Sequence, residues 1–154
     1  MPINTVRNYL NGQSHGPNQY DVGSVRPNWF NLYERDNNGE NIHPYHLYIR
    51  YDSIERYFYV SVYYGGRANW QANFANATNQ LANIQQSMQN DARWANICYV
   101  LNNSANLVPV QAGRDPNNPR YFEYKIKNPN DDLPPTQAQL DVIKKLVDLL
   151  FEKF

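Results

Sequence analysis

Two aromatic stretches, YHLYIRY (45–51) and YFYVSVY (57–63), decide the fold of this chain. In the first stretch alternate positions are aromatic or aliphatic, which is typical of a half-buried β-strand: Tyr45, Leu47, Ile49 and Tyr51. The second stretch is rich in β-branched and aromatic residues, which also favour strands. The four-residue stretch Asp52–Glu55 is predicted to join the two as a hairpin.

The other elements follow from hydrophobic spacing and from turn residues. Helices are predicted at 2–10, from Trp70 to Met88 and from Thr136 to Phe154, strands at 29–33, 97–101 and 121–127, and loops at 11–28 and 111–120. Thr136 and Gln139 have capping-box spacing at the start of the last helix. The pattern predicts one α+β domain, 1–154, with a mixed or antiparallel sheet flanked by helices. Because the last helix runs to Phe154 without a C-cap glycine, we expect the N-terminal part of a longer protein.

The composition excludes several classes of protein. The 154 residues carry fourteen Lys and Arg and fourteen Asp and Glu, so the formal net charge is zero. Polarity comes instead from 23 Asn, and aromatic residues make up 14%, which argues against disorder. A single cysteine, Cys98, excludes a disulfide framework and is read as a buried structural thiol. The N-terminus lacks the apolar core of a signal peptide, so a cytoplasmic protein without a membrane span is expected.

The sequence shows no complete catalytic motif. It has no glycine-rich phosphate loop, and His43 and His46 are predicted to lie on opposite faces of a strand, which is poor geometry for a metal. We therefore expect no enzyme activity, no metal and no cofactor. Glu123 and Lys125 are the one exception, because they resemble half of a Mg-dependent nuclease site; the usual Asp partner on an adjoining strand is missing, since Asp115 is a loop residue, and alternating charges on the exposed face of a strand explain the pair equally well.

The order of features in the chain resembles the N-terminal DNA-binding domain of McrB-type modification-dependent (type IV) restriction proteins. The resemblance rests on a polar loop before PNWF (27–30), on HPYHLYIRYD (43–52), on FYVSV (58–62) ending at Gly65, and on the C-terminal YFEYKIKNPNDDLPPTQAQL. The chain has Pro-Asn-Trp where the family has Pro-Trp, and His43 where the family commonly has Tyr before Pro.

The resemblance implies a DNA-reading module of an antiviral restriction system in bacteria. Such a domain flips a methylated cytosine out of double-stranded DNA into an aromatic and aliphatic pocket. Carried over by position, the pocket is Trp29, His43, Leu47 and Tyr45, and the wedge that fills the gap in the duplex is Tyr20. Proximity to the pocket strands suggests phosphate contacts from Arg26, Arg35, Arg50 and Arg67. A downstream motor domain and a separate nuclease subunit are the implied partners.

Two other classes stay open from the sequence. Zero net charge together with abundant Tyr and Asn also fits a small bacterial protein-interaction module, such as an immunity or antitoxin protein. A Mg-dependent nuclease built on Glu123 and Lys125 is the second.

Overall fold

The computed structural model describes residues 1–101 and 107–154. Its centre is a sheet of seven strands in the order β1-β2-β3-β4-β5-β7-β6, in which every neighbouring pair is antiparallel. The strands are β1 (Ser14–His15), β2 (Asn18–Arg26), β3 (Trp29–Arg35), β4 (His46–Asp52), β5 (Tyr57–Tyr63), β6 (Val110–Ala112) and β7 (Tyr121–Lys127). The helices are α1 (Pro2–Leu10), α2 (Trp70–Gln89), α3 (Trp94–Val100) and α4 (Gln137–Lys153). The predicted α+β class is confirmed.

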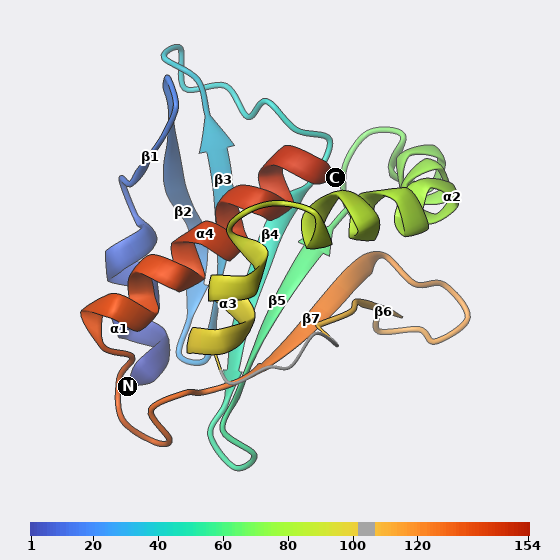
Figure 1. Ribbon diagram of the computed structural model, residues 1–154. Coiled ribbons are helices and arrows are strands. Elements are labelled where there is room, and N and C mark those ends of the chain that lie inside the picture. Colours follow the sequence, from blue (N-terminus) through green and yellow to red (C-terminus); the bar gives the residue numbers. More distant parts are fainter. Residues whose placement is uncertain (102–106) are drawn as a thin grey trace.

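The helices cover one face of the sheet (Figure 1). α4 runs across the middle of this face, with α1 and α3 beside it and α2 near the end that holds the C-terminus (Figure 1). The predicted capping box starts α4, because the Thr136 side chain accepts from the Gln139 amide and the Gln139 side chain accepts from the Thr136 amide. None of the helices in the described ranges has the length and apolarity that a membrane crossing requires.

The core lies between the helices and this face of the sheet. The strands contribute every second residue to it, as the alternation predicted. These buried residues are Phe30, Leu32, Leu47, Ile49, Tyr51, Phe58, Val60, Val62, Phe122, Tyr124 and Ile126. Phe74 of α2 stacks on Phe122 at 4.7 Å between ring centroids, and the Tyr45 hydroxyl donates to the Leu150 carbonyl of α4 at 3.0 Å.

Two predicted elements were wrong. Residues 11–28 were expected to be a loop, yet they form β1 and β2, because pairing of β2 with β3 outweighs the turn-forming composition. Residues 97–101 were expected to be a strand, but Trp94–Val100 is helical. A short apolar run suits either state, and here the buried positions Trp94, Ile97 and Cys98 follow helical spacing. Cys98 is buried as predicted, and burial raises the pKa of its thiol.

The opposite face of the sheet, here called the open face, has no helix packed on it among the described elements (Figure 1). Its side chains come from the other set of alternate positions, which are mainly aromatic and polar. They include Trp29, Asn31, Tyr33, His46, Tyr48, Arg50, Tyr59, Ser61, Tyr63, Tyr121, Glu123 and Lys125.

Candidate functional site

The open face contains a hollow of about 510 Å³. Adjacent strands β3, β4, β5 and β7 form its floor, and the segment between β6 and β7 forms one wall. The lining residues are Trp29, Asn31, His46, Tyr48, Tyr63, Arg114, Asp115, Arg120 and Tyr121. We call this site the aromatic hollow.

The rings in the aromatic hollow form one connected group. Trp29 and Tyr48 are 5.2 Å apart between centroids, and Tyr63 and Tyr121 are stacked at 5.3 Å. Tyr48 links these two pairs, at 6.1 Å from Tyr63 and 6.4 Å from Tyr121. His46 stacks on Tyr63 at 5.1 Å. Such a surface offers flat π faces to a planar ligand.

Polar atoms without hydrogen-bond partners lie in and beneath this aromatic group. They are His46 Nδ1, Asn31 Oδ1 and Ser61 Oγ. His46 is only 8% exposed and Ser61 is fully buried. A buried polar atom that makes no hydrogen bond costs about 1–3 kcal/mol, so three of them together need an explanation. His46 and Asn31 line the hollow, but their unpartnered atoms are closed to solvent, so a ligand would reach these atoms only after the two side chains turn.

The charge state of His46 suits a neutral partner. Burial, with a smaller effect from nearby Arg67, lowers the pKa of His46 to about 4. The imidazole is therefore neutral at neutral pH, and a neutral imidazole has one donor and one acceptor nitrogen. Burial also raises the pKa of Tyr48 and of Tyr121, so both phenols keep their protons. The hollow can form hydrogen bonds without placing a charge on its floor.

A glycine at the rim allows the side chains of the hollow to come close together. A β-carbon at Gly65 would lie 2.8 Å from Arg120 Cδ and 2.9 Å from Tyr63 Cε1, which is closer than real contacts allow. The absence of a side chain at Gly65 therefore lets the side chains of Arg120 and Tyr63 lie close to the backbone just after β5.

The arginines predicted to bind phosphate are distributed unevenly. Arg26 is exposed and its guanidinium carbon lies 5.8 Å from the Trp29 ring centroid, at one end of the hollow. Arg50 lies on the open face but stacks on Tyr59 at 3.7 Å and approaches Glu123 at 3.7 Å. Arg35 pairs with Asp21 at 2.8 Å. Arg67 donates to the His43 carbonyl at 3.2 Å. Arg114 and Arg120, at the other end of the hollow, were not singled out by the sequence.

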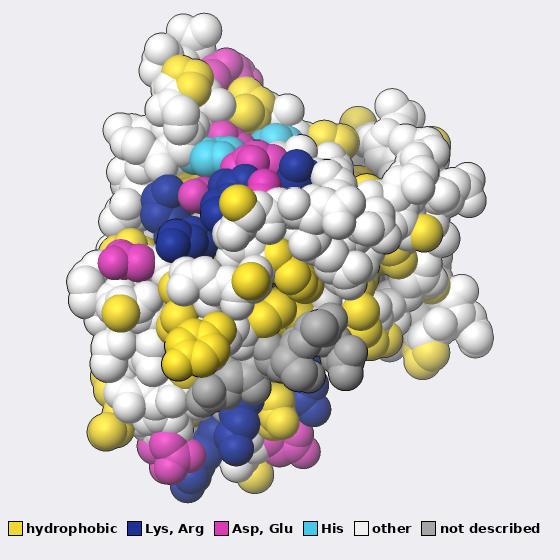
Figure 2. Space-filling model, in the orientation of Figure 1, with side chains coloured by type: hydrophobic (Ala, Val, Ile, Leu, Met, Phe, Trp, Pro, Cys, Tyr) yellow, Lys and Arg dark blue, Asp and Glu magenta, His cyan; other side chains and the backbone are white. Residues whose placement is uncertain are grey.

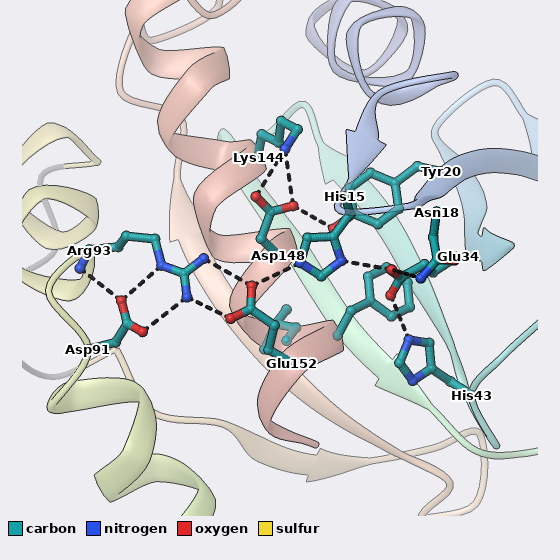
Figure 3. Close-up of polar contacts among 12 residues, drawn as sticks. His15, Asn18, Tyr20, Glu34, His43, Asp91, Arg93, Lys144, Asp148 and Glu152 are labelled. Atoms are coloured by element: carbon teal, nitrogen blue, oxygen red, sulfur yellow. Dashed lines mark hydrogen bonds and ion pairs between the residues drawn. The ribbon is translucent and has the colours of Figure 1, made fainter. Parts of the chain in front are cut away.

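A second polar cluster lies on the helix-covered side (Figure 3). Glu34, at the end of β3, is 2% exposed and lies 2.7 Å from His43 Nε2, 2.8 Å from His15 Nδ1 and 3.1 Å from Asn18 Nδ2. The other ring nitrogen of His15 is 2.9 Å from Glu152 of α4. We call this group the Glu34 cluster.

The Glu34 cluster extends into the helices through ion pairs. Arg93 bonds to Glu152 at 2.7 Å and to Asp91 at 2.8 Å, which links α4 to the segment before α3 (Figure 3). Burial alone would lower the pKa of His15, but its hydrogen bonds to Glu152 and Glu34 raise it. Burial would raise the pKa of Glu34, yet bonds from His43 and His15 lower it. Opposite charges inside the cluster therefore hold the two layers together.

Figure 2 shows the same arrangement at the surface of the helix side. Charged and histidine side chains gather over α4 and its neighbours, whereas the region of α2 is almost without charge (Figure 2). The twenty residues of α2 indeed contain no Asp, Glu, Lys or Arg.

The residues predicted to form one base pocket are not brought together. Trp29 lies in the aromatic hollow on the open face. Leu47 and Tyr45 are in the core beneath the other face, at 0% and 1% exposure. His43 belongs to the Glu34 cluster and stacks on Phe151 at 5.0 Å. The register explains the separation, since Leu47 lies opposite Leu32 and shares its face, while Trp29 lies opposite Arg50.

Tyr20 was predicted as the wedge, and the structure places it in the core under α4. The ring is 1% exposed, stacks on Phe151 of α4 at 5.3 Å, and its hydroxyl donates to Asp148 of α4 (Figure 3). Tyr20 packs here because β2 is a strand of the sheet and not a loop. A ring held in this way is a core contact.

His43 and His46 lie on opposite sides of the sheet as predicted, in the Glu34 cluster and the aromatic hollow, although His43 precedes β4 and is not part of the strand. The nuclease residues Glu123 and Lys125 share the open face of β7, with Glu123 near Arg50 and Lys125 3.7 Å from Glu55. Within residues 1–101 and 107–154, no group of three or more His, Cys, Asp or Glu side chains is arranged to hold a metal ion.

None of the family models, curated proteins or solved structures compared with the chain matches it. The McrB-type resemblance therefore stays a prediction. Sequence reasoning missed His46, Asn31 and Tyr63 as site residues. The alternation of strand faces could have revealed them, because these residues occupy the strand positions that alternate with the apolar ones.

Proposed function

We propose that this protein is a DNA-binding module that recognises a modified base held, unstacked from its neighbours, in the aromatic hollow. The base class comes from the resemblance to modification-dependent restriction proteins, with methylated cytosine as the first candidate. The observation that carries the proposal is the cluster of aromatic rings in one hollow of the open face, with His46 and Asn31 in its lining.

The chemistry of the aromatic hollow suits a nucleobase. Stacking of a base on an aromatic side chain contributes about 1–3 kcal/mol. A base edge carries hydrogen-bond donors and acceptors that match a neutral imidazole and an amide oxygen. A methyl group adds apolar contact worth about 1 kcal/mol. Exposed Arg26, Arg114 and Arg120 around the rim supply positive charge for the adjoining phosphates, although the whole chain is neutral.

A revised set of residues replaces the predicted pocket. Trp29 keeps its role as a stacking aromatic, and Tyr48 lies beside it. His46 and Asn31 take the place that His43 had in the predicted pocket. A motor domain and a nuclease subunit remain the partners that the resemblance indicates, and the cytoplasmic location expected from the sequence remains part of the proposal.

The test is direct binding of fluorescently labelled DNA, with methylated or unmethylated cytosine, to the wild-type protein and to two tyrosine variants. Tyr48→Ala removes a ring from the hollow and should weaken binding about 10- to 100-fold. Tyr57→Ala is the matched control, since Tyr57 lies on the open face of β5 but does not line the hollow. It should leave the affinity unchanged. Circular dichroism checks that both variants fold.

Either of two results would overturn the proposal. One is the absence of binding to any DNA at low salt. The other is an equal affinity for DNA in folded Tyr48→Ala and Tyr57→Ala, because that would place the binding surface elsewhere.

A further inference from the structure

We propose that the ligand of the aromatic hollow is an unpaired stretch of two or three nucleotides, which crosses β3, β4, β5 and β7 with its ends at Arg26 and at Arg114 and Arg120. This inference rests on the proposed function and deepens it. It concerns the form in which the DNA is bound, while the proposed function concerns the base in the hollow.

The dimensions of the open face set the length of the ligand. The aromatic side chains extend over four adjacent strands, from Trp29 on β3 to Tyr121 on β7. The ring centroids step from Trp29 to Tyr48 over 5.2 Å and from Tyr48 to Tyr121 over 6.4 Å, and these two steps set the length of the path. In one common RNA-binding module, the aromatic residues on the exposed face of a four-stranded sheet stack two or three bases. The path is therefore longer than a single base requires.

The charges lie where a strand that follows this path would place its phosphates. Arg26 is at the β3 end, and Arg114 and Arg120 are at the β7 end. All three are exposed, and within residues 1–101 and 107–154 none of them forms an ion pair shorter than 4.0 Å. Arg35 and Arg93, by contrast, are already paired with carboxylates. Asp115 is the one acidic residue in the lining.

The position of Tyr20 favours unpaired DNA. Extracting a base from a duplex costs a few kcal/mol, which a wedge in the vacated space helps to offset. Tyr20, the residue assigned to that task, is buried under α4 on the other face. DNA that is already unpaired avoids this cost, and it can lie flat along the row of rings.

The experiment compares three ligands that carry the same methylated cytosine: a mononucleotide, a trinucleotide, and a duplex with the base at its centre. We expect the trinucleotide to bind at least 10-fold more tightly than the mononucleotide, and an unpaired oligonucleotide to bind at least 10-fold more tightly than the duplex. Binding is measured by calorimetry for the small ligands and by anisotropy for the longer ones.

The salt dependence tests the two ends of the path. Each phosphate neutralised on a single strand contributes about 0.7 to the slope of log K against log salt. Arg26→Gln and Arg114→Gln should each reduce the slope for the trinucleotide by about that amount. The affinity for the mononucleotide should stay within about 3-fold of the wild-type value, because each variant keeps the arginine at the other end of the path. Arg35→Gln is the matched control, since its guanidinium is bonded to Asp21 outside the hollow. Its slope should equal that of the wild type.

The possible failures are distinguishable. If the mononucleotide binds as tightly as the trinucleotide, or the duplex as tightly as the unpaired strand, the extended path is wrong while the base site stands. If both arginine variants keep the wild-type slope, the path is also wrong. If no ligand binds, or if Tyr48→Ala leaves the affinity unchanged, the proposed function is wrong and the inference that rests on it is wrong too.

Discussion

The two faces of the sheet differ in how their buried polar atoms are hydrogen-bonded. On the helix-covered face, Glu34 has three side-chain partners and both ring nitrogens of His15 are bonded to carboxylates. On the open face, His46 Nδ1 and Asn31 Oδ1 have none. The comparison separates a cluster whose buried polar groups are bonded to one another from a face that holds buried polar atoms without partners.

The largest effect is expected in the Glu34 cluster. Glu34→Gln removes the charge that His15 and His43 share in a buried site, and it should lower the free energy of unfolding by about 3 kcal/mol. The melting temperature should fall by about 6–12 °C. Glu123→Gln is the control on the open face, where the nearest cation, Arg50, is 3.7 Å away, and should cost less than about 1 kcal/mol. Equal losses would contradict the comparison.

Acid should destabilise the open face through His46. A histidine has a pKa of about 6.5 when unfolded, and that of His46 falls to about 4 on folding. The unfolded state therefore binds the proton first, and stability present above pH 6.5 is lost as the pH falls towards 4, by about 3 kcal/mol in total. His46→Phe lacks this contribution. Denaturant unfolding of both proteins between pH 7 and 4 measures this contribution. If the free energy of unfolding falls equally with pH in the wild type and in His46→Phe, the prediction is wrong.

A smaller effect is expected from the hydroxyl of Tyr20. Tyr20→Phe removes its hydrogen bond to Asp148 and should cost about 1.5 kcal/mol, because the acceptor is charged. Tyr48→Phe on the open face is the matched control and should change stability by less than about 0.5 kcal/mol. Urea unfolding measures both. A negligible cost at Tyr20 would show that this bond does not tie β2 to α4.

The smallest effect has the opposite sign. Ser61 is fully buried and its hydroxyl has no partner, so Ser61→Ala removes an unsatisfied polar atom. The variant should be as stable as the wild type or more stable by up to about 1 kcal/mol. The same urea measurement decides it. A loss above about 1 kcal/mol would show that the hydroxyl forms a hydrogen bond in solution, so that the open face has fewer unpartnered polar atoms than described.

Local patterns in the sequence predicted the parts of the fold that depend on neighbouring residues. The hairpin of β4 and β5 follows from the alternation of apolar residues in the first strand and from the β-branched and aromatic residues of the second. The start of α4 follows from Thr136 and Gln139. β2 was missed because its exposed positions are polar and its pairing with β3 is a tertiary contact. α3 was misassigned because a five-residue apolar run does not distinguish helix from strand.

The site was only partly predictable for a geometric reason. Trp29 was identified from the sequence and lies in the hollow. Leu47 was grouped with it, but the face that each residue occupies depends on the register between β3 and β4, and a shift by one residue reverses it. The unpartnered state of His46 and Asn31 depends on every neighbour in space, so no spacing rule reveals it.

The two borders of the sheet have a consequence for handling and crystallising the protein. β1 has two residues and pairs only with Asn18 and Gln19 of β2, and β6 has three and pairs only with 121–123 of β7, so among the described strands much of β2 and β7 has no strand on its outer side. Long, flat border strands recruit other chains by extending the hydrogen-bond ladder, and short ones limit this. The irregular register of β2 between Val22 and Val25 interrupts the edge that β1 leaves uncovered, so a concentrated preparation should resist strand-to-strand aggregation on that side.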